Sequence, residues 1–218
     1  MHMIAFISQN GEMVWTAIGQ HILICFVAEC LGILVALPLG ILLTRKKRMA
    51  AWVLGIFGVV NTIPSLVLLG VAMIVLGLGF IPAVAVLFIY SLLPIMRNTY
   101  IGITELSPKY IKAARGVGMS RMQMLLQVEI PLALPAILTG IRISAIYIIS
   151  WATLSAFIGA GGLGDLIWSG LQSYNYTMVM AGALPATILA LLTGFLLSIA
   201  EKMASRYARG ARAEEVKS

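Results

Sequence analysis

The sequence contains few charged residues. Asp, Glu, Lys and Arg make up 11% of its 218 residues, whereas an ordinary soluble domain carries about 25%. Hydrophobic residues make up 61%, and the mean hydropathy is +1.01. Too little polar surface is left to cover a water-soluble globule, which excludes a soluble enzyme and a nucleic-acid-binding domain. The abundance of Leu, Ile and Val excludes a disordered chain. We therefore predict an all-α polytopic membrane protein.

Cysteine and histidine are scarce as well. Cys25 and Cys30 lie five residues apart in one apolar segment, where they face different sides of a helix, which argues against a disulfide. The two histidines, His2 and His21, are too few for a metal site. Residues 1–12 contain no Lys or Arg and so lack the positive region of a secretory signal. We expect neither a metal nor another cofactor.

Long runs without charge set the expected number of spans. A transmembrane helix needs about 20 mostly apolar residues. Residues 49–96 contain no charge and are punctuated by Gly and Pro at 77–82, while residues 143–200 contain only Asp165. Five spans are expected, at 14–44, 50–76, 81–97, 133–158 and 177–200. A sixth would arise only if one of these runs were split further.

Basic residues predict the orientation. All fifteen Lys and Arg fall in three clusters, within 45–48, 97–142 and 202–217, and positive loops stay cytoplasmic. Two spans between successive clusters satisfy this rule. We therefore expect an extracytoplasmic N-terminus over 1–13, a transmembrane domain over 14–200 and a cytoplasmic tail over 201–218. The net charge of +7 is explained by topology and needs no nucleic-acid partner.

The cytoplasmic loop over 98–131 is too long to be without structure. It is expected to form two short helices. Ser107 can cap the first, with Pro108 at the favoured first position. Ser120 and Gln123 form a capping box for the second. Such a loop could dock on a soluble partner, or rest on anionic membrane lipid through its basic residues, which are Lys109, Lys112 and Arg115.

Two stretches of this loop carry a family resemblance. Residues 112–118 read Lys-Ala-Ala-Arg-Gly-Val-Gly and residues 128–131 read Val-Glu-Ile-Pro. Together they resemble the motif Glu-Ala-Ala, three residues, Gly, nine residues, Ile-x-Leu-Pro of binding-protein-dependent ABC importer permeases. Lys112 reverses the charge of the family's Glu, so no role is carried over for that acid; Val128 and Ile130 are mild changes.

The resemblance implies the type I ABC importer permease fold and a role for the loop. The loop helix would dock in a groove of the ATPase subunit, where small residues permit close backbone approach. The residues implied in this coupling are Ala113, Ala114, Gly118, Ser120 and Pro131.

Further stretches narrow the resemblance, which covers residues 16–198. Residues 61–66 and 90–103 look like permeases for osmoprotectants such as glycine betaine, carnitine and choline. Residues 158–164 are similar to that group and also to methionine-type permeases. The family implies a bacterial cytoplasmic membrane protein paired with a second permease subunit, identical or similar, and served by an extracytoplasmic substrate-binding protein.

The chain is expected not to be an enzyme. It has no Walker A or Walker B motif, so ATP would be hydrolysed by a separate ATPase dimer. The alternatives are a permease for an amino acid such as methionine, an ion-coupled secondary transporter, and a membrane anchor that transports nothing. A secondary transporter would need more intramembrane charge and usually internal repeats.

A glycine pattern at 159–164 matches the dinucleotide-binding fingerprint literally. That fingerprint requires a preceding strand and a βαβ unit, whereas here the pattern follows a membrane span. We expect a glycine-rich turn and then a short interfacial helix on the outer face. In the resembled family this surface would contact the binding protein, through Gly161, Gly164, Asp165 and Trp168.

Three groups of residues are candidates for the translocation pathway. Glu29 lies mid-span, where an acid costs about 2.5–3.5 kcal/mol; it could attract a quaternary ammonium ion or be satisfied by a partner at a subunit contact. Tyr147 and Trp151, four residues apart, could offer a cation–π surface or serve ordinary helix packing. Asn61, Thr62 and Ser65 surround Pro64 and form a polar break of the kind that lines a cavity.

Overall fold

The computed structural model describes residues 2–214, and these are helical almost throughout. The expected outer N-terminus and cytoplasmic tail each extend beyond this range, at residue 1 and at 215–218. In chain order the elements are α1 (His2–Thr44), α2 (Lys47–Thr62), α3 (Ser65–Leu76), α4 (Phe80–Thr104), α5 (Pro108–Gly116), α6 (Arg121–Met124), the π-helical η1 (Leu125–Glu129), α7 (Ile130–Ala152), the 3-10 helix η2 (Thr153–Ile158), α8 (Leu163–Gln172) and α9 (Tyr176–Glu214).

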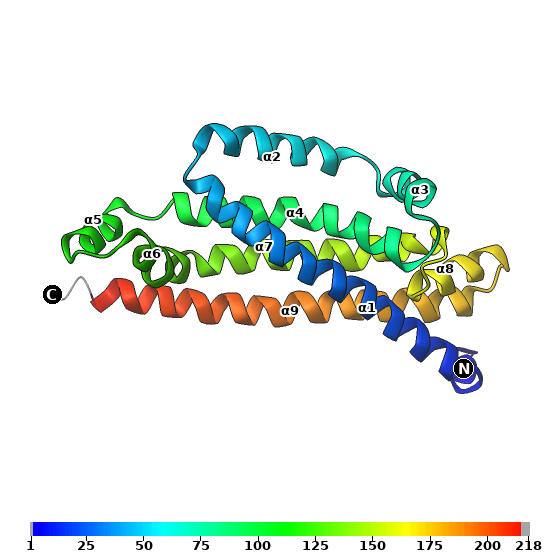
Figure 1. The fold of residues 1–218 in the computed structure, drawn as a ribbon. Coiled ribbons are helices and arrows are strands. Elements are labelled where there is room, and N and C mark those ends of the chain that lie inside the picture. Colours follow the sequence, from blue (N-terminus) through cyan, green and yellow to red (C-terminus); the bar gives the residue numbers. More distant parts are fainter. Residues whose placement is uncertain (1, 215–218) are drawn as a thin grey trace.

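Four helices in the described range are long and apolar enough to cross a membrane. They are Ser8–Thr44, Phe80–Thr104, Arg121–Ile158 and Tyr176–Arg206. Figure 1 shows α1 running obliquely across α4, α7 and α9, with the loop helices α5 and α6 at the end where the C-terminus lies. The N-terminus and α8 lie at the opposite end.

The span expected over 50–76 is broken at the expected polar break around Pro64. α2 and α3 are bent by 95° at the break between them, so they form a broken span or a re-entrant loop. Pro64 disfavours helical backbone at the residue before it, and Ile63 is accordingly extended, with φ −68° and ψ 130°. A fifth span exists only if this bent pair crosses as a unit.

Small residues set how closely the helices pack. A methyl group added at Gly40 of α1 would lie 2.9 Å from the carbonyl oxygen of Met96 in α4. One added at Gly140 of α7 would lie 2.8 Å from the carbonyl oxygen of Pro94. Membrane helices commonly associate through such small residues, because the backbones can then approach closely. The two crossings hold α4 between α1 and α7.

Buried hydroxyl groups inside the bundle bond to their own helices. Ser91 donates to the carbonyl of Phe88 at 2.6 Å, and Thr99 donates to that of Ile95 at 2.8 Å. Both side chains are fully buried. Because hydrocarbon offers no alternative partner, these short-range bonds allow polar residues to sit in the core without a cross-helix network.

The loop helices differ in part from expectation. Ser120 and Gln123 form the expected capping box, with bonds of 2.8 and 3.3 Å. Ser107 precedes α5 but makes no side-chain capping bond. The second loop helix was expected to be separate from the following span; instead α6, η1 and α7 run on as one helix. The π-helical turn ends two residues before Pro131, whose ring would otherwise clash with the preceding turn.

Candidate functional site

The residues of the loop motif differ in their exposure to solvent. Ala113 and Gly118 are exposed, but Ala114 is only 4% exposed and packs against its own chain. Gly118 has φ +79°, and no atom lies within 4 Å of where its Cβ would be. Ala114 is therefore covered by its own chain, and its expected role in coupling remains a prediction. Met119 N–H donates to the Ala114 carbonyl at 3.1 Å and closes the turn after α5.

An ion pair at the base of the loop was missed by the sequence analysis. Arg45, just after α1, donates through Nη1 to Oε1 of Glu129 at 3.1 Å and through Nη2 to Oε2. Glu129 is 2% exposed and ends the π-helical turn. The sequence did contain a signal for this ion pair: an acid stands at the variable position of the loop motif, and a basic cluster lies at 45–48.

Glu29 bonds to a neighbouring helix. Ser144 Oγ in α7 donates to its Oε2 at 2.7 Å, while Oε1 is buried without a hydrogen-bond partner among the described residues. Glu29 borders an apolar cavity of about 400 Å³ between α1, α7 and α9, which also includes Cys25 and Cys30. Both cysteines are free thiols, as expected. This bond lies within the chain, so both roles considered for Glu29, in the pathway and at a subunit contact, remain predictions.

The polar break after α2 is tied to α4. Tyr90 Oη donates to the carbonyl of Ile63 at 2.5 Å, which satisfies a backbone group freed by the Pro64 break. Asn61 and Thr62 donate to carbonyls of their own helix, at 3.3 and 2.7 Å. Thr62 is exposed and Ser65 is partly buried.

Three aromatic rings connect this break to α7. The ring centroids of Tyr90 and Trp151 lie 4.4 Å apart, and those of Trp151 and Tyr147 lie 5.3 Å apart. Tyr90 is buried, whereas Tyr147 is 48% exposed. The stack therefore begins in the core and ends on an accessible ring. Tyr90 was not singled out from the sequence, since one tyrosine in an apolar run carries no signal of its partner.

The accessible ring lies on a second cavity, of about 310 Å³. It is lined by Asn61, Leu93, Pro94, Arg97, Asn98, Ile101, Ile143 and Tyr147. The structure thus brings Asn61 and Tyr147 together but leaves Glu29 in the other cavity. From the sequence, Arg97 serves only to predict the topology, and no role is predicted for Asn98.

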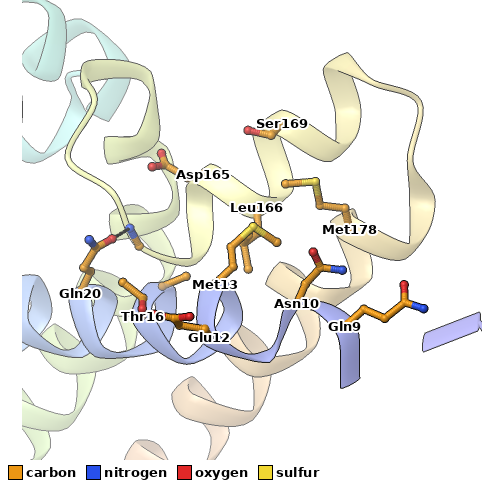
Figure 2. Close-up of a pocket in the computed structure, with 12 residues that line it drawn as sticks. Gln9, Asn10, Glu12, Met13, Thr16, Gln20, Asp165, Leu166, Ser169 and Met178 are labelled. Carbon is orange, nitrogen blue, oxygen red and sulfur yellow. Dashed lines mark hydrogen bonds between the residues drawn. The ribbon is translucent and has the colours of Figure 1, made fainter. Parts of the chain in front are cut away.

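At the opposite end of the bundle, the start of α1 and α8 border a pocket of about 640 Å³. Figure 2 shows Glu12 on α1 and Asp165 on α8 at this pocket, with Gln20 bonded to the glycine-rich turn. Gly162 N–H donates to Gln20 Oε1 at 3.0 Å. Burial raises the pKa of the Asp165 carboxyl above its ordinary value.

The other glycine-turn candidates divide between surface and interior. Gly161 has φ +80°, which requires glycine, and Trp168 is 38% exposed with its ring 4.3 Å from that of Phe157. Gly164, in contrast, is buried, and a methyl group there would lie 2.7 Å from the carbonyl carbon of Thr153. Gly164 therefore allows the tight packing of the turn and is not accessible to a partner.

Comparison with known proteins places the chain. Residues 32–209 match the family of binding-protein-dependent transport system inner membrane components. The chain belongs to this permease family. The permease is 46% identical over 194 residues to the carnitine transport permease protein OpuCB of Listeria monocytogenes, covering 89% of each chain. It is 44% identical over 201 residues to the choline transport system permease protein OpuBB of Bacillus subtilis, covering 92% of this chain and 93% of the relative.

Solved structures give the fold of the permease. An inward-facing MetNI methionine ABC transporter has a chain that matches with a TM-score of 0.78 at 22% identity, covering 90% of this chain and 98% of that one. An amino acid ABC transporter with histidines matches with a TM-score of 0.74 at 22% identity, covering 90% and 96%. The expected ABC importer permease fold is confirmed, and the protein is a multi-pass membrane protein.

Proposed function

We propose that this permease forms the membrane path of an ATP-driven importer for quaternary-ammonium osmoprotectants such as glycine betaine, carnitine and choline. The observation that carries the proposal is the aromatic stack from Tyr90 through Trp151 to Tyr147, which ends on an accessible cavity beside the polar break. A quaternary ammonium ion is attracted to an aromatic face. The named functions of the relatives point to the same class of solute.

The importer would contain an ATPase, a second permease subunit and a binding protein. The sequence contains no Walker motif, so a separate ATPase dimer would supply the energy. Two permease subunits, identical or similar, would enclose the pathway in a bacterial cytoplasmic membrane. The extracytoplasmic binding protein would contact the α8 end through Gly161, Asp165 and Trp168, with Gly164 shaping the turn beneath.

Coupling would act through the opposite end. Ala113, Gly118 and Ser120 would contact the ATPase, and Ala114 would support them from inside. Closure of the ATPase dimer on ATP would pull on α5 and α6. Because α6 continues through Pro131 into α7, this movement would tilt a pathway helix and switch the permease between inward- and outward-facing states.

Uptake measurements test the proposal. The complete importer, with its ATPase and binding protein, is assayed in proteoliposomes with labelled glycine betaine, carnitine, choline and methionine. ATP-dependent uptake of one or more of the quaternary amines is expected. Uptake of methionine alone would favour an amino-acid permease, and uptake driven by an ion gradient without ATP would favour a secondary transporter.

A further inference from the structure

The cavity beside Tyr147 contains a cationic side chain, which is unexpected next to a path for cations. Arg97 is the one charged residue among those that line it. It lies inside α4, which continues to Thr104, and close in sequence to Thr99, where α4 packs on Gly40 of α1. Arg97 is therefore several residues deeper in the bundle than the basic cluster at 45–48.

Among the residues whose side chains the structure describes, Arg97 forms neither an ion pair nor a hydrogen bond. The ion pairs found among them are Arg45–Glu129 and Arg142–Glu201. Arg97 is exposed, and its guanidinium retains five donors suited to a carboxylate. Because Arg97 and Tyr147 line the same cavity, that cavity combines a group that attracts an anion with a ring that attracts a cation.

We propose that this cavity recognises a zwitterion: Arg97 binds the carboxylate of the solute while the ring of Tyr147 holds its quaternary ammonium group. The proposal rests on the proposed function and specifies its substrate class. Glycine betaine and carnitine carry both groups, whereas choline carries a hydroxyl in place of the carboxylate. The cavity of about 310 Å³ lies at the small end of the ~300–1,000 Å³ range of small-molecule sites.

The neighbouring groups hold this pair of recognition elements in place. The ring of Tyr147 contacts that of Trp151, which contacts that of Tyr90, in tilted arrangements, and Tyr90 is bonded to the backbone at Ile63. Asn98 donates to the Pro94 carbonyl at 2.8 Å, so its amide is held against α4 beside Arg97. The ring therefore stays in position without a ligand, which lowers the ordering cost of binding.

Electrostatic interactions with Arg97 determine which solutes the cavity prefers. A carboxylate makes charge-assisted, bidentate bonds to a guanidinium, and these are about twice as strong as neutral hydrogen bonds. Choline would place an uncompensated cation near Arg97, and the like charges would repel. The cavity therefore favours the zwitterions over choline at the membrane step, independently of what the binding protein selects.

The test compares variant with wild-type uptake for each solute, using the same binding protein so that its selectivity cancels. Arg97→Gln removes the charge, Arg97→Lys keeps it, and Arg48→Gln is the matched control, because Arg48 is exposed and lies outside the cavity. Arg97→Gln should lower glycine betaine and carnitine uptake about tenfold or more, the equivalent of a lost charged hydrogen bond. Choline uptake should be unchanged or raised. Arg97→Lys should retain part of the zwitterion uptake.

Tyr147 provides the second arm. Tyr147→Leu should lower uptake of all three solutes, since each carries the ammonium group, whereas Tyr147→Phe keeps the ring and should restore most of the uptake that Tyr147→Leu loses. An equal loss for choline and glycine betaine in Arg97→Gln would overturn zwitterion recognition, and so would no loss for either. A wild-type importer that transports no quaternary amine would instead overturn the proposed function.

Discussion

Arg45 and Glu129 bind each other through both carboxylate oxygens and join the end of α1 to the π-helical turn from which α7 continues. Glu129 is buried, whereas the Arg45 side chain is 47% exposed. The pair lies directly between the loop helices and the spans. In the proposed coupling, movement of the loop would therefore reach α1 as well as α7.

Glu129→Gln should loosen this connection. Breaking a fully buried pair costs about 3–5 kcal/mol, and the loss here should be smaller, because solvent screens the exposed arginine. We expect folded protein in reduced yield, with uptake several-fold lower while ATP hydrolysis persists. The measurement is uptake and hydrolysis on the same proteoliposomes. The double variant Arg45→Glu with Glu129→Arg should recover part of the coupling; wild-type uptake in Glu129→Gln would exclude a coupling role.

Gly118→Trp should weaken ATPase association without unfolding the chain. No atom lies within 4 Å of where the Cβ would be, although φ +79° adds a local strain of about 1–2 kcal/mol. Two quantities are measured: the amount of ATPase that co-purifies with the permease, and the ATP hydrolysed for each solute molecule taken up. Lys112→Glu serves as control, because it restores the family residue on an exposed position and should be tolerated. Full ATPase retention and transport by Gly118→Trp would argue for a lipid-facing loop.

Ala114→Asp should act by a different route. Ala114 is 4% exposed, so the carboxylate would be buried against the loop itself and would disturb the turn that Met119 closes. We expect greater protease sensitivity of the loop as well as uncoupling. Ala113→Asp is the matched variant at an exposed position and should leave protease sensitivity unchanged. Equal sensitivity of the two variants would contradict the inward position of Ala114.

Asp165 predicts a pH dependence of stability at the α8 end. Burial raises its pKa in the folded state, so the charged form is disfavoured there. The stability this provides is fully present below the unfolded pKa of about 3.9 and is lost as pH rises through the folded value. Asp165→Asn should therefore raise Tm slightly near neutral pH, and the gain should vanish at low pH. Thermal unfolding in detergent across this range checks it; a gain independent of pH would point to packing instead.

Cysteine labelling tests the orientation. In a background with Cys25→Ser and Cys30→Ser, an impermeant reagent should label Ser8→Cys in intact cells. Lys202→Cys, at an exposed position near the other end, should label only after the membrane is opened. This follows from the placement of basic residues on the cytoplasmic side. The reverse pattern would contradict the proposed sidedness.

Local chemistry made several features predictable from the sequence. Hydrocarbon admits only backbone that satisfies its own hydrogen bonds, so charge-free runs indicated long apolar helices. The capping box at Ser120 depends on residues three apart and formed as expected. Pro64 marked a break for the same local reason, although its 95° bend depends on how α3 packs.

Contacts between distant segments were decided by the tertiary structure. Ser144 meets Glu29 across 115 positions, and Arg45 meets Glu129 across 84. Tyr90 reaches Trp151 because α4 and α7 pack closely at Gly140. Hydropathy specifies that a helix is buried in lipid, but it does not specify its rotation or its crossing point. Those depend on close backbone approach at particular small residues, and they alone determine which polar and aromatic side chains share a cavity.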